Sequence, residues 1–132
     1  MKVICKSRVL SKAENIALGY SANCATGYEL TVGKEYLVLG MNFQAASLIN
    51  KGVILLLKDD IGRCAFVPLF LLELSDSNLS HLWVARTFNE SDFCLWPKEF
   101  FTNYFFDDLS DGDPSAMATF KRVCEELHEE CK

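Results

Sequence analysis

Runs of apolar residues in the first two thirds of the chain predict β-strands. The clearest lie at residues 35–40, 52–58 and 63–67, and the last two are separated by Asp59-Asp60-Ile61-Gly62. Acidic residues followed by glycine between two apolar runs favour a hairpin turn, because glycine accepts the positive φ that such turns require. We therefore predict a hairpin whose tip carries Asp59 and Asp60.

Weaker patterns extend the β-rich region at both ends. Residues 3–5 predict a short opening strand and residues 83–87 a last one. Pro68 is expected to end or bend the strand before it, because proline cannot donate to a sheet ladder. Residues 7–28 mix small and polar side chains and contain only a weak helical patch around residues 12–18.

Helical periodicity replaces the strand pattern in the final third. Pro97 suits the first turn of a helix, and aromatic residues follow it at positions 100, 101, 104 and 105. Asp113 and Pro114 predict the N-cap and first residue of a second helix, which runs to about residue 130. Its apolar stripe comprises Met117, Phe120, Cys124, Leu127 and Cys131. The polar segment 107–113 is predicted to be a turn between the two helices.

These patterns together predict an α+β fold in a single domain over residues 1–132. The apolar stripe of the last helix can bury itself only against the β-rich part of the chain. We expect a small antiparallel β-meander or partly open barrel over residues 1–88, with two C-terminal helices, within residues 97–130, packed on it. A chain of this length can bury a core without a disulfide or a metal.

The charge is distributed unevenly. The net charge is −5, but residues 1–58 carry +4 and residues 59–132 carry −9. A strongly acidic half repels phosphate, which argues against direct binding of nucleic acid and favours a basic macromolecule as partner. The alternative interpretation is a solvated acidic face without a partner.

The chain is expected to be cytoplasmic, without a membrane span. The longest apolar run is residues 64–72 with Pro68 inside it, too short to cross a bilayer, and residues 1–8 do not form a signal peptide. The six cysteines include no C-x-x-C pair. In a reducing compartment we interpret them as free thiols in the core.

No catalytic, metal or cofactor motif is recognisable, so the chain is predicted not to be an enzyme and to need no cofactor. Its two histidines, His81 and His128, lie outside any nucleophile motif. Cys124, His128 and Cys131 lie near one helical face, but a structural zinc site needs four ligands. A calcium loop starting at Asp107 fails because Leu109 occupies its third position.

An acidic cluster interleaved with aromatic residues is the remaining candidate site. Aromatic rings surrounded by acids suit an interface with a basic protein. The alternative is that the rings are buried on most sides between the sheet and the last helix. The predicted partner-binding residues are the hairpin and cluster acids Asp59, Asp60, Glu90, Asp92, Glu99, Asp107, Asp108, Asp111 and Asp113, with the aromatic residues Trp96 and Tyr104.

Several stretches resemble small bacterial proteins with a Src-homology-3-like β-barrel. They are residues 1–5, 30–40, the hairpin 59–70, and the later segments 79–84 and 105–113. The resemblance covers about three quarters of the chain, and residues 7–28 lie outside it. It rests on a fold-bearing pattern and not on a catalytic motif, so it implies a fold and carries no residue roles.

Some small acidic proteins of this kind serve as immunity proteins of polymorphic toxin systems, including contact-dependent growth inhibition. The resemblance therefore implies that the chain, as a monomer, binds a cognate toxin domain, often a basic nuclease, and occludes its active site. The residues leave open an alternative: a regulatory or scaffolding barrel that binds a cellular protein or peptide through exposed aromatic residues such as Trp83, Trp96 and Tyr104.

Overall fold

The fold is α+β, with seven strands and three α-helices in the described residues of a computed structural model, 1–25, 27–45 and 49–132. In chain order the elements are β1 (Lys2–Cys5), α1 (Lys12–Ala17), β2 (Glu35–Gln44), β3 (Gly52–Lys58), β4 (Cys64–Pro68), the 3₁₀ turn η1 (Leu69–Leu71), β5 (Leu72–Asp76), β6 (Trp83–Thr87), β7 (Phe93–Pro97), the 3₁₀ turn η2 (Lys98–Phe101), α2 (Phe105–Ser110) and α3 (Pro114–Glu130).

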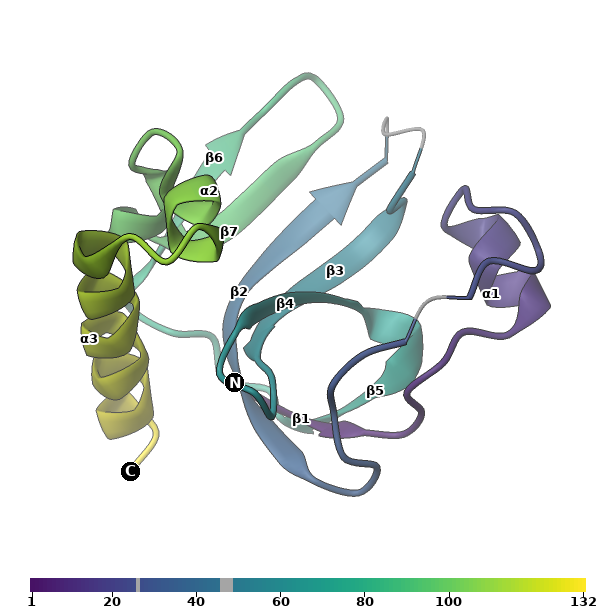
Figure 1. Cartoon of the computed structure of the whole chain (residues 1–132), viewed down its shortest axis with the longest axis horizontal. Coiled ribbons are helices and arrows are strands. Elements are labelled where there is room, and N and C mark those ends of the chain that lie inside the picture. Colours follow the sequence, from purple (N-terminus) through teal and green to yellow (C-terminus); the bar gives the residue numbers. More distant parts are fainter. Residues whose placement is uncertain (26, 46–48) are drawn as a thin grey trace.

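The long strand β2 organises an antiparallel sheet that does not close into a barrel. One edge of β2 pairs with β3, which pairs in turn with β4. The other edge is shared: β1 pairs with its first residues, at Glu35–Leu37, and β7 with a later stretch, at Met41–Phe43. The sheet therefore divides into two arms along β2, one continuing to β5 and the other to β6 (Figure 1).

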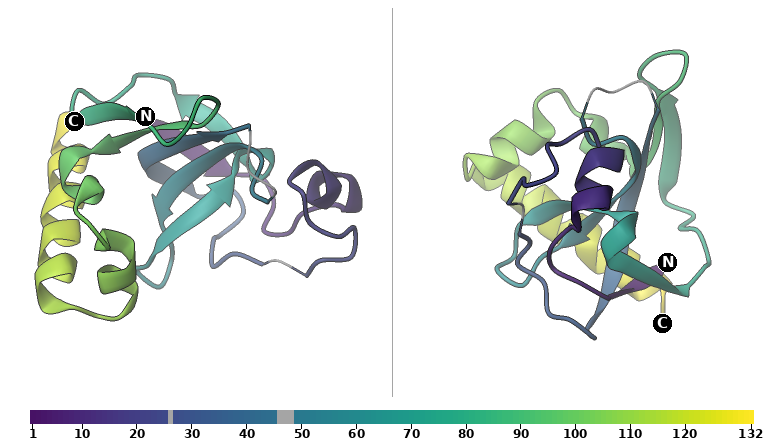
Figure 2. Two further views of the ribbon diagram at one scale, coloured as in Figure 1. Left: turned by 90° about the horizontal axis from the view of Figure 1, so that it is seen from above. Right: turned by 90° about the vertical axis from the view of Figure 1, so that its right-hand side faces the viewer.

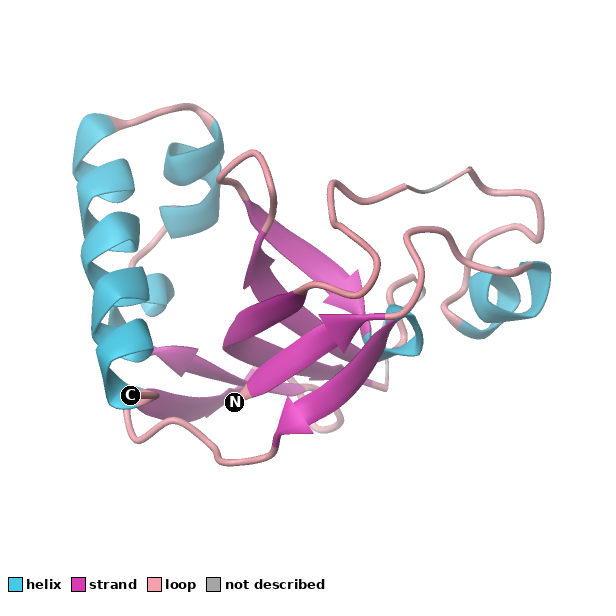
Figure 3. Cartoon of the chain, turned by 90° about the horizontal axis from the view of Figure 1, so that it is seen from below, coloured by secondary structure: helices cyan, strands magenta, loops and turns pink. Residues whose placement is uncertain are grey.

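Helices lie at opposite ends of this sheet. In Figure 1, and from above in Figure 2, α2 and α3 lie at one end, while α1 and its connecting loops extend from the other. Figure 3 shows from below that the helices lie at both ends of the sheet. The two ends of the chain lie close together: the Met1 amino nitrogen is 4.0 Å from the Cys131 sulfur.

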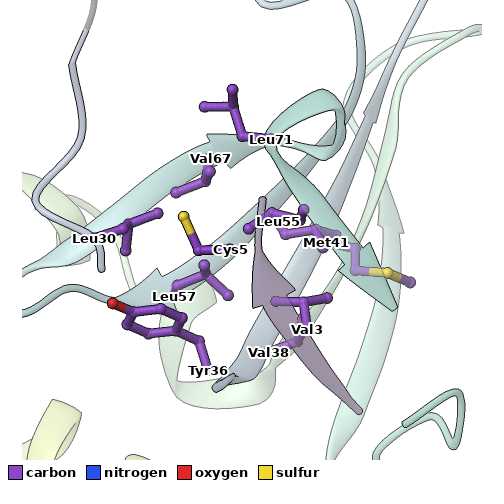
Figure 4. Close-up of a cluster of buried hydrophobic side chains, with 11 residues drawn as sticks. Val3, Cys5, Leu30, Tyr36, Val38, Met41, Leu55, Leu57, Val67 and Leu71 are labelled. Atoms are coloured by element: carbon purple, nitrogen blue, oxygen red, sulfur yellow. The ribbon is translucent and has the colours of Figure 1, made fainter. Parts of the chain in front are cut away.

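The central strands are buried on both faces, and this produces two cores. In β3 the run Ile54–Leu57 is fully apolar and buried. Leu55 and Leu57 point into a first core with residues of β1, β2 and β4, which Figure 4 displays. Leu56 lies in a second core with Leu39, the aromatic residues around Phe100 and the inner face of α3. A continuous apolar run rather than an alternating one is what burial on both faces requires.

The helix α3 forms as the sequence predicts. The Asp113 carboxylate accepts a hydrogen bond from the Ala116 N–H at 2.9 Å, and Pro114 occupies the first turn. The buried face differs in detail from the predicted stripe: Phe120 and Leu127 are buried as expected, but Val123 is buried and Met117 is exposed. Met117 instead lines a groove, described below.

The segment from 93 to 110 corrects the sequence-based prediction. Residues 83–87 are a strand but not the last one, because Phe93–Pro97 forms β7. Pro97 ends this strand and is also the N-cap of the short 3₁₀ helix η2, whereas the α-helix α2 begins only at Phe105. Asp107 and Asp108 consequently lie in the first turn of α2, not in an inter-helix turn. Acidic side chains there interact favourably with the helix dipole.

Within the described residues, no helix is both long and apolar enough to cross a membrane.

Candidate functional site

The two C-terminal helices carry a set of exposed carboxylates. We call this set the acidic helical layer, and it consists of Asp107, Asp108, Asp111, Asp113, Glu125, Glu126, Glu129 and Glu130. Two of the nearby cations are already paired: Arg122 lies 2.8 Å from Glu126 and 3.1 Å from Glu99, and Lys132 lies 2.9 Å from Glu129. The layer therefore presents mostly negative charge to solvent.

Tyr104 stands at the start of this layer. It is the N-cap of α2, its φ is 62°, and its side chain is 76 % exposed. A positive φ is uncommon for a bulky residue and marks a tight turn between η2 and α2. Tyr104 thus offers an exposed ring next to the α2 carboxylates.

Several predicted site residues are turned inward. Asp59 is 6 % exposed, and its oxygens accept hydrogen bonds from the Ile61 and Arg63 N–H groups and from the Arg63 guanidinium. Asp92 is 6 % exposed and accepts a bond from the Ala45 N–H. Trp96 is buried and donates its indole N–H to the Asn42 side chain at 2.7 Å. These side chains offer little surface to a partner.

The other predicted residues are distributed over separate loops. Glu90 is exposed on the turn between β6 and β7. Glu99 is largely buried and forms its ion pair with Arg122. Asp60 lies on the β3–β4 turn, where its carboxylate accepts hydrogen bonds from the Thr31 hydroxyl, the Lys34 ammonium and the Tyr36 hydroxyl. Among the predicted residues, those brought together around one element are Asp107 and Asp108 of α2 and its two caps, Tyr104 and Asp111.

The Asp60 hydrogen bonds predict acid-dependent stability. Donation from Lys34, Thr31 and Tyr36 lowers the pKa of Asp60 to about 2, against about 3.9 in an unfolded chain. The ionised carboxylate therefore stabilises the fold fully above pH ~4, and this contribution is lost as the pH falls from there through ~2. We expect Asp60→Asn to remove this loss, as measured by urea unfolding at pH 7, 4, 3 and 2. As a control, Glu90→Gln, which changes an exposed carboxylate on the β6–β7 turn, should keep the acid dependence of the wild type. Equal acid dependence of the wild type and Asp60→Asn would contradict the assignment.

The glutamates of α3 were missed as site residues by the sequence analysis. Glu125 and Glu129 lie opposite the buried positions Val123 and Leu127, and Glu126 and Glu130 lie beside that buried face. This spacing is visible in the sequence and indicates one outward helix face. Glu130 also accepts a hydrogen bond from the His81 N–H at 3.0 Å, which ties the loop before β6 to α3.

A groove of about 880 Å³ lies between the β3–β4 turn and the two C-terminal helices. The turn contributes Ile61 and Arg63, and the helices contribute Leu109, Met117 and Lys121. Thus the predicted hairpin tip, through Asp59, and the helices α2 and α3 border the same hollow.

The cysteine thiols in and near this region are poor nucleophiles. Burial raises the pKa of Cys64, which lines the groove, to about 12, and that of Cys124 on α3 to about 11. Both thiols are therefore protonated near neutral pH, and the thiolate is the reactive form. Among the residues that the structure describes, no group of three or more His, Cys, Asp or Glu side chains could hold a metal ion.

Comparison of the chain with protein-family models, with curated proteins and with solved structures finds no match.

Proposed function

We propose that this protein binds a toxic enzyme domain, a basic nuclease, and neutralises it by occluding its active site. The observation that carries this proposal is the acidic helical layer. Residues 105–130 hold eight Asp or Glu against two Lys or Arg, one of which, Arg122, is held by Glu99 and Glu126. A nuclease cleft is positive because it binds phosphate, so an exposed acidic surface is complementary to it.

The resemblance to immunity proteins of polymorphic toxin systems supports the same proposal. In this view the open, bent sheet is a partly open Src-homology-3-like barrel, and the protein acts as a cytoplasmic monomer. Electrostatic steering toward a basic partner speeds association, to as much as about 10⁸–10⁹ M⁻¹s⁻¹ at low salt. Fast association is what a cell needs when it neutralises an incoming toxin.

The test is a pull-down of the tagged protein from the cells that encode it, at low and at moderate salt. The proposal expects one basic nuclease domain to copurify, with binding that weakens as ionic strength rises. In a direct assay, the purified protein should inhibit that nuclease at a one-to-one ratio. An empty pull-down, or a partner held equally well at both salt concentrations, would argue against charge-led inhibition.

Neutralising Asp107 of α2 and Asp111 at its C-cap should slow association with such a partner. Asp107 and Asp111 are four residues apart and so lie on the same side of the helix. We expect Asp107→Asn combined with Asp111→Asn to lower the association rate constant by roughly three- to tenfold at low ionic strength, with little change in the dissociation rate. Stopped-flow or surface-based kinetics would measure both rates.

A matched control separates local from overall charge. Glu73→Lys on β5 raises the net charge by the same two units at an exposed position away from the C-terminal helices. It should leave the association rate nearly unchanged. Equal slowing by both variants would place the partner's contact elsewhere than α2.

A second candidate function is suggested by the edge strand β6. It pairs with β7 on one side, and no described strand pairs with its other side. Val84 and Phe88 are exposed along or next to it. An edge strand with exposed apolar side chains can pair with an extended peptide, as in a regulatory or scaffolding protein. Such binding would change little with salt, whereas charge-led inhibition would weaken.

A further inference from the structure

We propose that the groove between the β3–β4 turn and the helices α2 and α3 binds a small amphipathic anion. Such a ligand has an apolar ring system or chain and a carboxylate, sulfonate or phosphate group at one end. The proposal does not depend on the function proposed above, because it concerns the interior of the groove and not the acidic helical layer. It rests on the walls of the groove and on the cations at its border.

The walls are apolar and partly exposed. The groove is lined by Ile61 from the β3–β4 turn, Phe66 from β4 and Met117 from α3. All three are large apolar side chains that are exposed to solvent. Single exposed apolar side chains are ordinary, but three around one hollow form a surface that an apolar ligand would cover. The volume of about 880 Å³ lies within the range of roughly 300–1,000 Å³ of small-molecule sites.

Three cations line the same groove, although the protein as a whole is acidic. Lys58 ends β3, Arg63 follows the turn, and Lys121 lies on α3. Within residues 1–25, 27–45 and 49–132, neither Lys58 nor Lys121 forms an ion pair. Arg63 binds Asp59 through its Nε, at 3.2 Å. The two lysines therefore remain available to an anionic group.

The acids of the groove offset this charge only in part. Asp59 is buried, and its oxygens are held by the turn N–H groups and by Arg63. Glu29, the other carboxylate among the lining residues, is exposed and offsets one positive charge, so the lining holds three cations against two carboxylates. Lys58 and Lys121 also line a smaller hollow of about 340 Å³ together with Glu125 and Glu129, so they lie between the groove and those acids. The accessible charge that borders the groove is thus mainly positive, which is complementary to an anion.

The groove favours reversible binding. Cys64 lines it, and burial raises the pKa of this thiol to about 12, so the thiol is neutral and unreactive near neutral pH. The ligand would place its apolar part against Phe66 and Met117 and its anionic end toward Lys58 and Lys121. This division between an apolar body and a few charged groups is typical of small-molecule sites.

Fluorescent probes test the proposal on the full chain. Anilinonaphthalene sulfonate carries an apolar ring system and one negative charge, and N-phenylnaphthylamine is the same ring system without the sulfonate. We expect the anionic probe to bind the folded protein saturably, at one site per chain. Monomeric dodecanoate should displace it, whereas dodecyltrimethylammonium, with the same chain and a positive head, should not.

Charge-removing variants locate the anionic end. Lys58→Gln combined with Lys121→Gln should weaken binding of the anionic probe by about tenfold and leave the neutral probe unchanged. Lys98→Gln removes an exposed cation of η2 that does not line the groove. This control should leave the affinities for both probes as in the wild type.

A wall variant locates the apolar part. Met117→Glu changes an exposed helix position and should weaken both probes, whereas Leu74→Glu changes an equally exposed apolar residue of β5 outside the groove and should weaken neither. Circular dichroism would check that each variant is folded. Unsaturable binding, unchanged affinity in the double lysine variant, or equal effects of Met117→Glu and Leu74→Glu would overturn the proposal.

Discussion

Truncating Phe100 to alanine should lower the free energy of unfolding by about 3–5 kcal/mol, as is typical for a large aromatic residue in a core. Phe100 is 1 % exposed and lies at the centre of the second core. Its ring stacks on Phe105 with the centroids 5.0 Å apart, and contacts Phe106 at 5.6 Å and Phe120 at 6.0 Å. Removing it leaves a cavity and breaks all three ring contacts, each worth about 0.5–1.5 kcal/mol beyond burial.

The effect is expected to be large because the ring of Phe100 joins three elements at once. It lies on η2, which follows β7, and its partners lie on α2 and α3. A domain is stable by only about 5–15 kcal/mol in total, so the loss would be a large part of it. The α2–α3 layer should also become more accessible to proteolysis than the sheet.

Equilibrium unfolding in urea measures this prediction, with Phe70→Ala as the matched control. Phe70 lies on η1, is 44 % exposed and belongs to neither core. Its truncation should cost less than about 1 kcal/mol. If the two variants lose similar stability, the second core does not depend on Phe100.

Those parts of the fold that rest on local signals could be predicted from the sequence. The start of α3 follows from Asp113 and Pro114, and the β3–β4 hairpin follows from two apolar runs around a turn that ends in Gly62. A further local signal was present but not used: Ser11 and Glu14 form a capping box at the start of α1. This pattern of serine followed three residues later by glutamate marks a helix start.

Features that depend on tertiary contacts could not be predicted. The segment Phe93–Pro97 is aromatic and ends in proline, which fits a strand end as well as a helix start, and only pairing with β2 decides between them. Likewise, the positions of acidic residues in the sequence do not show that Asp59 is buried and Asp108 exposed. The first is satisfied by the N–H groups of its own turn, while the second remains exposed on a helix.

The groove was invisible to the sequence analysis for the same reason. Its walls come from residues 27–29, from the hairpin 58–66, and from α2 and α3, the first of which begins 39 residues after the hairpin. Met117 lies at the edge of the predicted stripe of α3, and in the structure it is exposed. Sequence spacing alone assigned that residue to the core.

Replacing Gly40 by alanine is the second substitution for which we expect a large loss of stability, of about 1–3 kcal/mol. Gly40 lies within β2 next to a register shift of the β2–β3 pairing, between Val38 and Gly40. A Cβ atom there would lie 2.8 Å from Trp96 Cδ1 and 2.9 Å from the Leu95 carbonyl oxygen, and both residues belong to β7. Because Leu95 contributes backbone, the clash cannot be relieved by a rotamer change alone.

The steric origin of the loss can be separated from the general effect of removing a glycine. Gly27→Ala is the control, since a Cβ at Gly27 meets nothing within 4 Å and Gly27 has no positive φ. Urea unfolding should give a small or even favourable change for Gly27→Ala, because alanine reduces the entropy of the unfolded chain. In Gly40→Ala the indole of Trp96 should also shift, and tryptophan fluorescence of the folded state would report this. Unchanged stability and fluorescence would mean that β7 can move away from β2 freely, and that the division of the sheet into two arms does not depend on this close approach.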